Sequence, residues 1–217
     1  GAKSISVSID PFEEEDNRAN NAVTRLVNVE AWRPRVLYLE GEPRWELKFV
    51  RRAVEDDRSL RLTSMLRTTQ NKIYVQGVDD PKELADGFPS TPEALFSYEG
   101  LILGSVEAVY FTPTQQELIR QFVDRRGGGL LFLGGKAALS EGGYAGSSLA
   151  ELLPVALPER KGTFQREEAV VQLTPAGNDS LICRLEDDPR KNELRWRQLP
   201  PLADFQEIGT PKPAALT

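Results

Sequence analysis

The stretch YEGLILGSVEAVYFTPTQQELIRQFVDRRGGGLLFLGGKAALSEGGY, residues 98–144, decides the fold class of this chain. Two short apolar runs, at 101–103 and 130–133, have the composition of strands that are covered on both faces in a parallel sheet. Between them Thr112 is placed to cap a helix that has Pro113 in its first turn. Apolar residues of this helix recur at helical spacing, at Leu118, Ile119, Phe122 and Val123. The stretch therefore predicts one βαβ unit.

The same alternation of strand and helix occurs once more upstream of this unit. Residues 35–39 form the first expected strand, a helix opens at Pro43, and residues 60–66 form the second expected strand. The sequence thus predicts an α/β fold with a doubly wound parallel sheet and helices on both of its faces. Its adjacent parallel strands are expected at residues 36–39, 62–66, 101–103 and 130–133.

The helix that opens at Pro43 is expected to be amphipathic. The pattern predicts an apolar side made of Trp45, Phe49, Val50, Ala53 and Val54. It predicts a solvated side made of Arg44, Lys48, Arg51, Arg52 and Glu55.

Two further segments have weaker patterns. Residues 69–97 are rich in Asp, Gly and Pro, and they are expected to form an irregular insertion that is functional or packs over a site as a lid. Residues 168–173 are expected to form one more strand. The single cysteine, Cys183, has apolar neighbours that favour a buried, inert thiol.

The segment before Pro34 has a different pattern from the rest of the chain. Apolar and polar residues alternate at 5–9 and at 23–29, which predicts two antiparallel strands outside the parallel sheet. The acidic run at 13–16 is read as a charged loop tip, because it lacks the alternating ligands and central glycine of a calcium loop. We therefore expect two domains, an N-terminal pair of strands at 1–33 and an α/β domain at 34–217.

The composition limits the possible partners. The chain of 217 residues carries 27 basic and 33 acidic residues, a net charge of −6 that opposes binding to nucleic acid or to an anionic membrane. No apolar run approaches the ~20 residues of a membrane span, so direct membrane insertion is not expected. The chain begins at Gly1 and ends without a structural stop, and we expect it to be a piece of a longer protein.

Several segments together resemble the class I glutamine amidotransferase-like superfamily, and in particular a non-catalytic bacterial branch found in large proteins, some with von Willebrand type A domains. The segments are RVLYLEGEPRWELKFVRRAV, LRLTSMLRT, GLILGSV, TPTQQELIRQFVDRRGGGLLFLGG, GGYAGSSLAELLPV, LTPAGNDSLICRLEDD and LPPL. They cover most of residues 35–202. The resemblance implies a flavodoxin-like fold, and residues 1–33 look like the last strands of a preceding immunoglobulin-like module.

Active members of that superfamily use a cysteine on a sharp strand-to-helix turn, activated by a histidine and an acidic partner. The corresponding turn here, residues 133–137, contains no cysteine, and the chain contains no histidine. Cys183 lies far downstream of the turn. The resemblance therefore implies a domain without the family's amidase chemistry.

Any ligand is expected in a crevice at the carboxyl ends of the strands, as in other open parallel sheets. Glu40, Glu42 and Glu46 could supply carboxylates for magnesium or acid/base chemistry, although a helix start also favours Glu42 and Glu46. Lys136 follows a glycine pair there, which is also typical of a tight turn with a solvated lysine. The residues expected to line this crevice are Glu40, Glu42, Arg44, Arg67, Ser105, Glu107, Gly135 and Lys136.

The sequence thus favours a non-catalytic binding or scaffolding module within a larger, membrane-associated bacterial protein. Its expected partners are a protein or neighbouring domains of the same polypeptide, or a small polar ligand, and no cofactor is expected. The alternative is a hydrolase that works through Glu40 and Glu42 without a Cys-His pair. A nucleotide or flavin module is disfavoured, because acidic residues and no phosphate-binding fingerprint follow the first strand.

Overall fold

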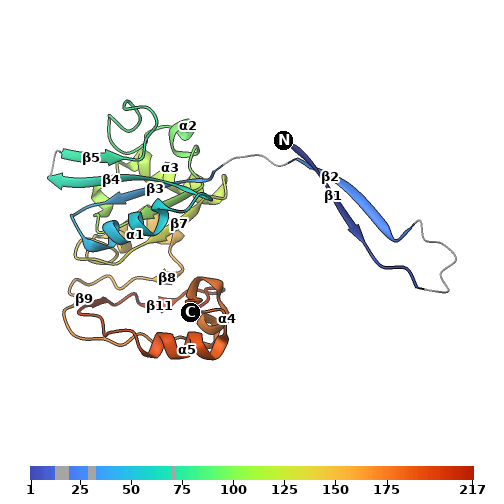
Figure 1. The fold of residues 1–217 in the computed structure, drawn as a ribbon. Coiled ribbons are helices and arrows are strands. Elements are labelled where there is room, and N and C mark those ends of the chain that lie inside the picture. The colour runs from blue at the N-terminus through green and yellow to red at the C-terminus, as the bar shows by residue number, and fades with distance from the viewer. Residues whose placement is uncertain (13–19, 29–32, 70–71) are drawn as a thin grey trace. The chain divides into compact units, whose positions relative to one another are not determined.

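The computed structural model describes residues 1–12, 20–28, 33–69 and 72–217, and the chain divides into two compact units, Gly1–Arg33 and Pro34–Thr217 (Figure 1). The first unit contains β1 (Ala2–Ser8) and β2 (Ala22–Asn28), which pair antiparallel with Val7 opposite Val23. The expected antiparallel pair is therefore present. The acidic run at 13–16 lies outside the described residues.

The second unit is built on a five-stranded sheet with the order β5-β4-β3-β6-β7. Four of these strands are parallel, namely β3 (Arg35–Glu40), β4 (Arg61–Thr69), β6 (Gly100–Leu103) and β7 (Gly129–Phe132). These are the four strands that the sequence predicts, in adjacent positions. The fold is therefore α/β with a mostly parallel central sheet.

Helices α1 (Trp45–Glu55) and α3 (Pro113–Asp124) lie on opposite faces of this sheet (Figure 1). β3 shows the corresponding alternation, because Leu37 and Leu39 belong to the main core while Tyr38 points to the other face and is also fully buried. The core on the α3 side contains the helix residues Leu118, Ile119 and Phe122 and the strand residues Leu101, Leu103 and Met65.

The predicted buried side of α1 is only partly correct, because Val50 and Val54 are half-buried as expected while Trp45, Phe49 and Ala53 are exposed. Trp45 and Phe49 are 67% and 58% exposed, and the buried residue of the helix is Leu47. Arg44 is the extended N-cap of α1 and points inward to Glu40, and Leu47 lies on the side of the helix that is buried. Arg44 was expected to be solvated, yet its side chain is only 15% exposed.

The insertion at 69–97 is more regular than the sequence predicts. It contains β5 (Lys72–Gln76), an antiparallel edge strand beside β4, and the short helix α2 (Pro92–Leu95). The strand expected at 168–173 is absent from the described residues there, where Ala169 makes a single bridge to Leu202.

After β7 the chain forms 3-10 turns and two short antiparallel ladders. β8 (Val155–Ala156) pairs with β11 (Thr210–Pro211), and β9 (Phe164–Gln165) pairs with β10 (Phe205–Gln206). The remaining helical elements are α4 (Pro175–Asp179), α5 (Pro189–Arg197), and the 3-10 helices at Ala108–Tyr110, Tyr144–Gly146, Ser148–Leu152 and Leu181–Cys183.

Cys183 is half-buried, and the side chains expected to bury it are themselves exposed, with Ile182 at 95%.

Candidate functional site

The candidate site lies where β3 and β6 end side by side at the middle of the sheet. The connection from β3 leads through α1 to β4 on one side, and the connection from β6 leads through α3 to β7 on the other side. Strand order reverses between β3 and β6, and this is the position at which open α/β sheets form a ligand crevice. Glu40 is the last residue of β3, and Ser105 comes two residues after the end of β6.

The Glu40 carboxylate is fully buried, and both of its oxygens accept hydrogen bonds. Oε2 accepts from the Tyr38 hydroxyl at 2.7 Å and from Nη2 of Arg44 at 2.9 Å. Oε1 accepts from the backbone N–H of Ser105 at 2.8 Å and from Nε of Arg44 at 3.2 Å. A buried charge needs this kind of full compensation, so the arrangement is a closed ion pair.

The protonation states of the two partners follow from this pairing. Burial and the neighbouring Glu40 carboxylate raise the pKa of Tyr38 far above its usual value, so its hydroxyl stays protonated and donates. Burial by itself lowers the pKa of Arg44, but the hydrogen bonds and the charge of Glu40 outweigh it and raise the pKa.

Arg44 also crosses the crevice to the turn after β7, where its Nη1 donates to the carbonyl of Gly134 at 2.7 Å. This close approach needs glycine at two points. A Cβ on Gly104 would lie 2.5 Å from Oε2 of Glu40, and a Cβ on Gly135 would lie 2.7 Å from Oγ of Ser105. The two glycines therefore allow three strand ends to close on one ion pair.

One hollow, of about 560 Å³, opens on the β4 side of this pair. At its wall Arg67 donates to the carbonyl of Gly41 at 2.9 Å and to Glu107 at 2.7 Å, and its guanidinium lies 5.7 Å from the centre of the Tyr110 ring. The lining also includes Glu42, Pro43, Thr68, Thr69 and Val109.

A second hollow, of about 530 Å³, opens on the β7 side. Here the side-chain Oε1 of Gln206, in β10 near the C-terminus, accepts a hydrogen bond from the backbone N–H of Gly135 at 3.0 Å. Its amide nitrogen donates to Oγ1 of Thr163 at 3.2 Å, which ties the turn after β7 to the C-terminal ladder. The wall also carries Lys136, an exposed side chain that makes no ion pair or hydrogen bond with the described residues.

The structure places the predicted crevice residues in two groups. Glu40 and Arg44 form the buried ion pair, and Ser105 and Gly135 lie beside it. Arg67 and Glu107 form part of the wall of the β4-side hollow. Glu42 lines both hollows, and Lys136 lines the β7-side hollow.

Three contributors to the crevice are not among the residues that the sequence predicts there. Tyr38 could have been found from its position, since it lies two residues before Glu40 on the same face of the strand. Gln206 and Thr163 belong to segments without hydrophobic periodicity, and the sequence carries no signal that brings them to this end of the sheet.

The turn at residues 133–137 is tied to the end of β6. The backbone N–H of Ala137 donates to Oγ of Ser105 at 3.0 Å. Cys183 is placed elsewhere, in a 3-10 turn whose carbonyl accepts from Nε1 of Trp196 at 2.7 Å. The described residues contain no group of three or more Cys, Asp or Glu side chains arranged to hold a metal ion.

Within the described ranges, no helix combines the length and the apolar composition needed to cross a bilayer. Comparisons with protein-family models, with curated proteins and with solved structures give no match to this chain.

Proposed function

We propose that residues 34–217 form a non-catalytic, glutamine amidotransferase-like domain of flavodoxin-like topology, which serves as a binding or scaffolding module in a larger, membrane-associated bacterial protein. One observation carries this proposal. The position at which the strand order reverses is filled by the closed Glu40–Arg44 ion pair, and hollows with both polar and apolar lining residues remain open on both sides of it.

The carboxylate hydrolase receives less support from the same geometry. A general base needs a free oxygen within reach of the substrate, and both oxygens of Glu40 are buried and occupied by donors. Glu42 is half-buried and lines the β7-side hollow together with Glu46 and Asp204, but the described residues there form no group of three or more side chains arranged to hold a metal ion. Binding needs no such group, and it is the function that the crevice can perform as it stands.

The mixed charge of the walls favours a polar ligand of low charge or a protein loop. Lys136 offers an unpaired ammonium on the β7-side hollow, while Glu42 faces both hollows and discourages a strongly anionic ligand. Recognition is therefore expected beside Lys136, and Glu42, Glu46 and Asp204 are the acidic groups of the same hollow that limit the ligand's negative charge.

The absence of amidase chemistry is tested by incubating the purified protein with L-glutamine and measuring ammonia. We expect no release above buffer, because the turn at 133–137 carries no thiol and the chain has no histidine. Ammonia release that co-purifies with the protein and persists in Cys183→Ala would overturn the non-catalytic assignment.

The site is tested by backbone NMR titration with L-glutamine and L-glutamate as probes of a polar, weakly charged ligand. We expect shifts at Gly134, Gly135 and Lys136, and we expect Lys136→Glu to weaken binding with less than about 0.5 kcal/mol change in stability. Lys191→Glu is the matched control on an exposed helix. Shifts confined to the outer helix faces, or affinity indifferent to Lys136→Glu, would place recognition outside the crevice.

A further inference from the structure

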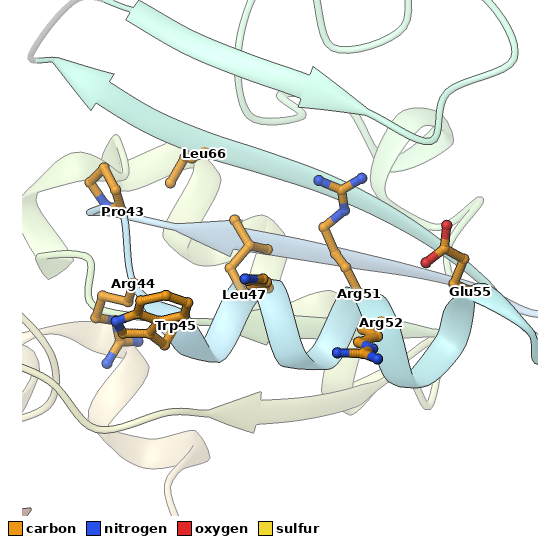
Figure 2. Close-up of a pocket in the computed structure, with 9 residues that line it drawn as sticks. Pro43, Arg44, Trp45, Leu47, Arg51, Arg52, Glu55 and Leu66 are labelled. Atoms are coloured by element: carbon orange, nitrogen blue, oxygen red, sulfur yellow. The ribbon is translucent and has the colours of Figure 1, made fainter.

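The outer side of α1 carries exposed aromatic residues beside a groove. Trp45 and Phe49 are 67% and 58% exposed with ring centres 6.3 Å apart, and Nζ of Lys48 lies 4.7 Å from the centre of the Trp45 ring. Between α1 and β4 lies a groove of about 580 Å³, and Figure 2 shows Leu47 of the helix and Leu66 of the strand turned toward each other across it. Its floor is therefore apolar.

The groove is also bordered by cations that have no acidic partner among the described residues. Lys48, Arg51 and Arg52 all line it, and none of them forms an ion pair or a side-chain hydrogen bond with the described residues. Glu55 stands at the far end of the groove. In a chain with a net charge of −6, three unpaired cations on one helix make a local positive patch on an acidic molecule.

The sheet beside this groove is incompletely covered. Leu66 of β4 pairs directly with Tyr74 of β5, so both side chains lie on the same face of the sheet. Tyr74 is 53% exposed, which means that α1 leaves this part of the face open. Parallel α/β sheets normally bury both faces under helices. The uncovered part of the sheet next to α1 is therefore a place where one more helix could pack.

We propose that this groove binds an acidic amphipathic helix of a partner protein, laid beside α1 over β4 and β5. The apolar side of that helix contacts Leu47, Leu66 and Tyr74, and its flanking carboxylates meet the unpaired cations of α1. The 11 residues of α1 give the groove a length of roughly 16 Å, about three turns of a bound helix.

A helix fits this groove better than other anionic partners. An extended segment could not add to β4, because β3 and β5 already occupy both of its edges. A flat membrane would meet Trp45 and Phe49 but would leave the groove floor unfilled, and nucleic acid would not use an apolar floor. An apolar floor with a cationic border is complementary to an acidic amphipathic helix.

The probe for this site is a fluorescein-labelled peptide of about 14 residues, roughly four helical turns, with leucines at i, i+3, i+4 and i+7 and glutamates on their flanks. Fluorescence anisotropy with the full chain should give saturable binding that weakens as salt screens the charges. A peptide of the same composition with the leucines scattered around the helix should bind much more weakly.

Two variants separate the charged and apolar contributions. Arg51→Glu with Arg52→Glu should weaken binding at least roughly tenfold, because like charges then face the peptide. Tyr74→Ala should weaken binding while leaving its salt dependence unchanged. The matched control is Arg190→Glu with Lys191→Glu on α5, which changes the net charge equally on exposed residues and should leave the affinity within about twofold of the wild type.

Several results would overturn the proposal. Absence of saturable binding would do so, as would equal binding of the scattered peptide or equal loss in the α5 control, both of which indicate nonspecific attraction. Vesicles of phosphatidylglycerol and phosphatidylcholine, and a single-stranded oligonucleotide, are titrated in parallel. If binding of the vesicles or of the oligonucleotide is weakened by Arg51→Glu with Arg52→Glu while binding of the peptide is not, the positive patch has a different partner. Circular dichroism confirms that each variant is folded.

Discussion

At the scale of single residues, the Glu40–Arg44 ion pair fills the centre of the crevice and leaves no carboxylate oxygen of Glu40 without a hydrogen-bond donor. Arg44 supplies donors to both oxygens of a carboxylate that is completely buried, and its own side chain is only 15% exposed. Removing one partner of such a pair leaves an uncompensated charge in a poorly solvated position. The pair therefore specifies the shape of the crevice even where its net contribution to stability is small.

We expect Arg44→Ala to lower the free energy of unfolding by roughly 3 kcal/mol or more, because Glu40 then loses its counter-charge. Replacing both residues, as Glu40→Gln with Arg44→Met, should cost less than Arg44→Ala alone. Urea unfolding of the single and double variants measures both values. A double variant at least as unstable as the single variant would show that the ion pair itself, and not the unpaired charge, governs stability.

Glu141 gives a pH dependence that belongs to the same scale. Its carboxylate accepts from the backbone N–H of Thr163 at 2.5 Å and from the Thr163 hydroxyl at 3.0 Å. The backbone hydrogen bond is the main cause that lowers the pKa of Glu141 below its usual value of 4.5. A carboxylate with a lowered pKa stabilises the fold above its unfolded pKa, and this contribution is lost as the pH falls through the folded pKa.

We therefore expect Glu141→Gln to be less stable than the wild type near neutral pH, with the difference disappearing between roughly pH 5 and pH 3. Thermal unfolding across this range measures the difference. The control is Glu167→Gln at an exposed position that makes no hydrogen bond with the described residues. A difference between Glu141→Gln and the wild type that grows toward low pH would contradict the assigned role of Glu141.

At the scale of elements, α3 is the helix whose ends the sequence defines best. The Thr112 hydroxyl accepts from the backbone N–H of Gln115 at 3.2 Å, and the Gln115 side chain accepts from the backbone N–H of Thr112 at 3.0 Å. The same glutamine donates to the carbonyl of Phe88 at 2.9 Å, so the cap also holds the insertion that precedes β6. The start of α3 is thus a junction between two segments.

We expect Thr112→Ala to destabilise the protein by about 1 kcal/mol, the usual cost of losing an N-cap side chain. Thr114→Ala, two residues later and exposed, should have little effect. Urea unfolding compares the two variants. Equal stability losses would mean that the capping box is not what fixes this helix start.

The elements also show what the sequence could predict. Residues 98–144 gave the βαβ unit because strand and helix periodicities are strong there and a capping residue marks the helix start. β5 escaped prediction because an edge strand of five residues inside a polar insertion has little apolar pattern. The buried side of α1 was predicted only in part, with Val50 and Val54 assigned correctly and Leu47 missed. The Arg44–Glu40 ion pair at the helix start was missed because it has no signature in hydrophobic periodicity.

The candidate crevice was predictable to the extent that topology determines it. Residues at the carboxyl ends of parallel strands gather at one end of the sheet. Glu40, Arg67, Ser105 and Gly135 could therefore be assigned to that end from the strand pattern alone. The pattern could not tell that Glu40 is closed off by Tyr38, because burial of a carboxylate depends on tertiary packing. The contribution of the C-terminal ladder likewise depends on contacts between residues far apart in the sequence.

At the scale of the whole molecule, the two units differ in how they bury apolar surface. The hydrophobic core runs from Leu37 to Val155 and draws every buried member from the unit Pro34–Thr217. In β1 and β2 every residue is exposed, including Ile5 at 51% and Val7 at 67%. A ladder of two strands with both faces exposed is at best marginally stable in water.

We therefore expect a chain that begins at Pro34 to unfold cooperatively, with a free energy of unfolding within about 0.5 kcal/mol of that of the full chain, because no core residue is removed. The peptide of residues 1–33 should show no cooperative transition by itself. Circular dichroism during urea unfolding measures both pieces and the full chain. Loss of the cooperative transition in the shortened chain would show that the N-terminal strands contribute to folding of the α/β unit, and the boundary at Pro34 would then have to move toward the N-terminus.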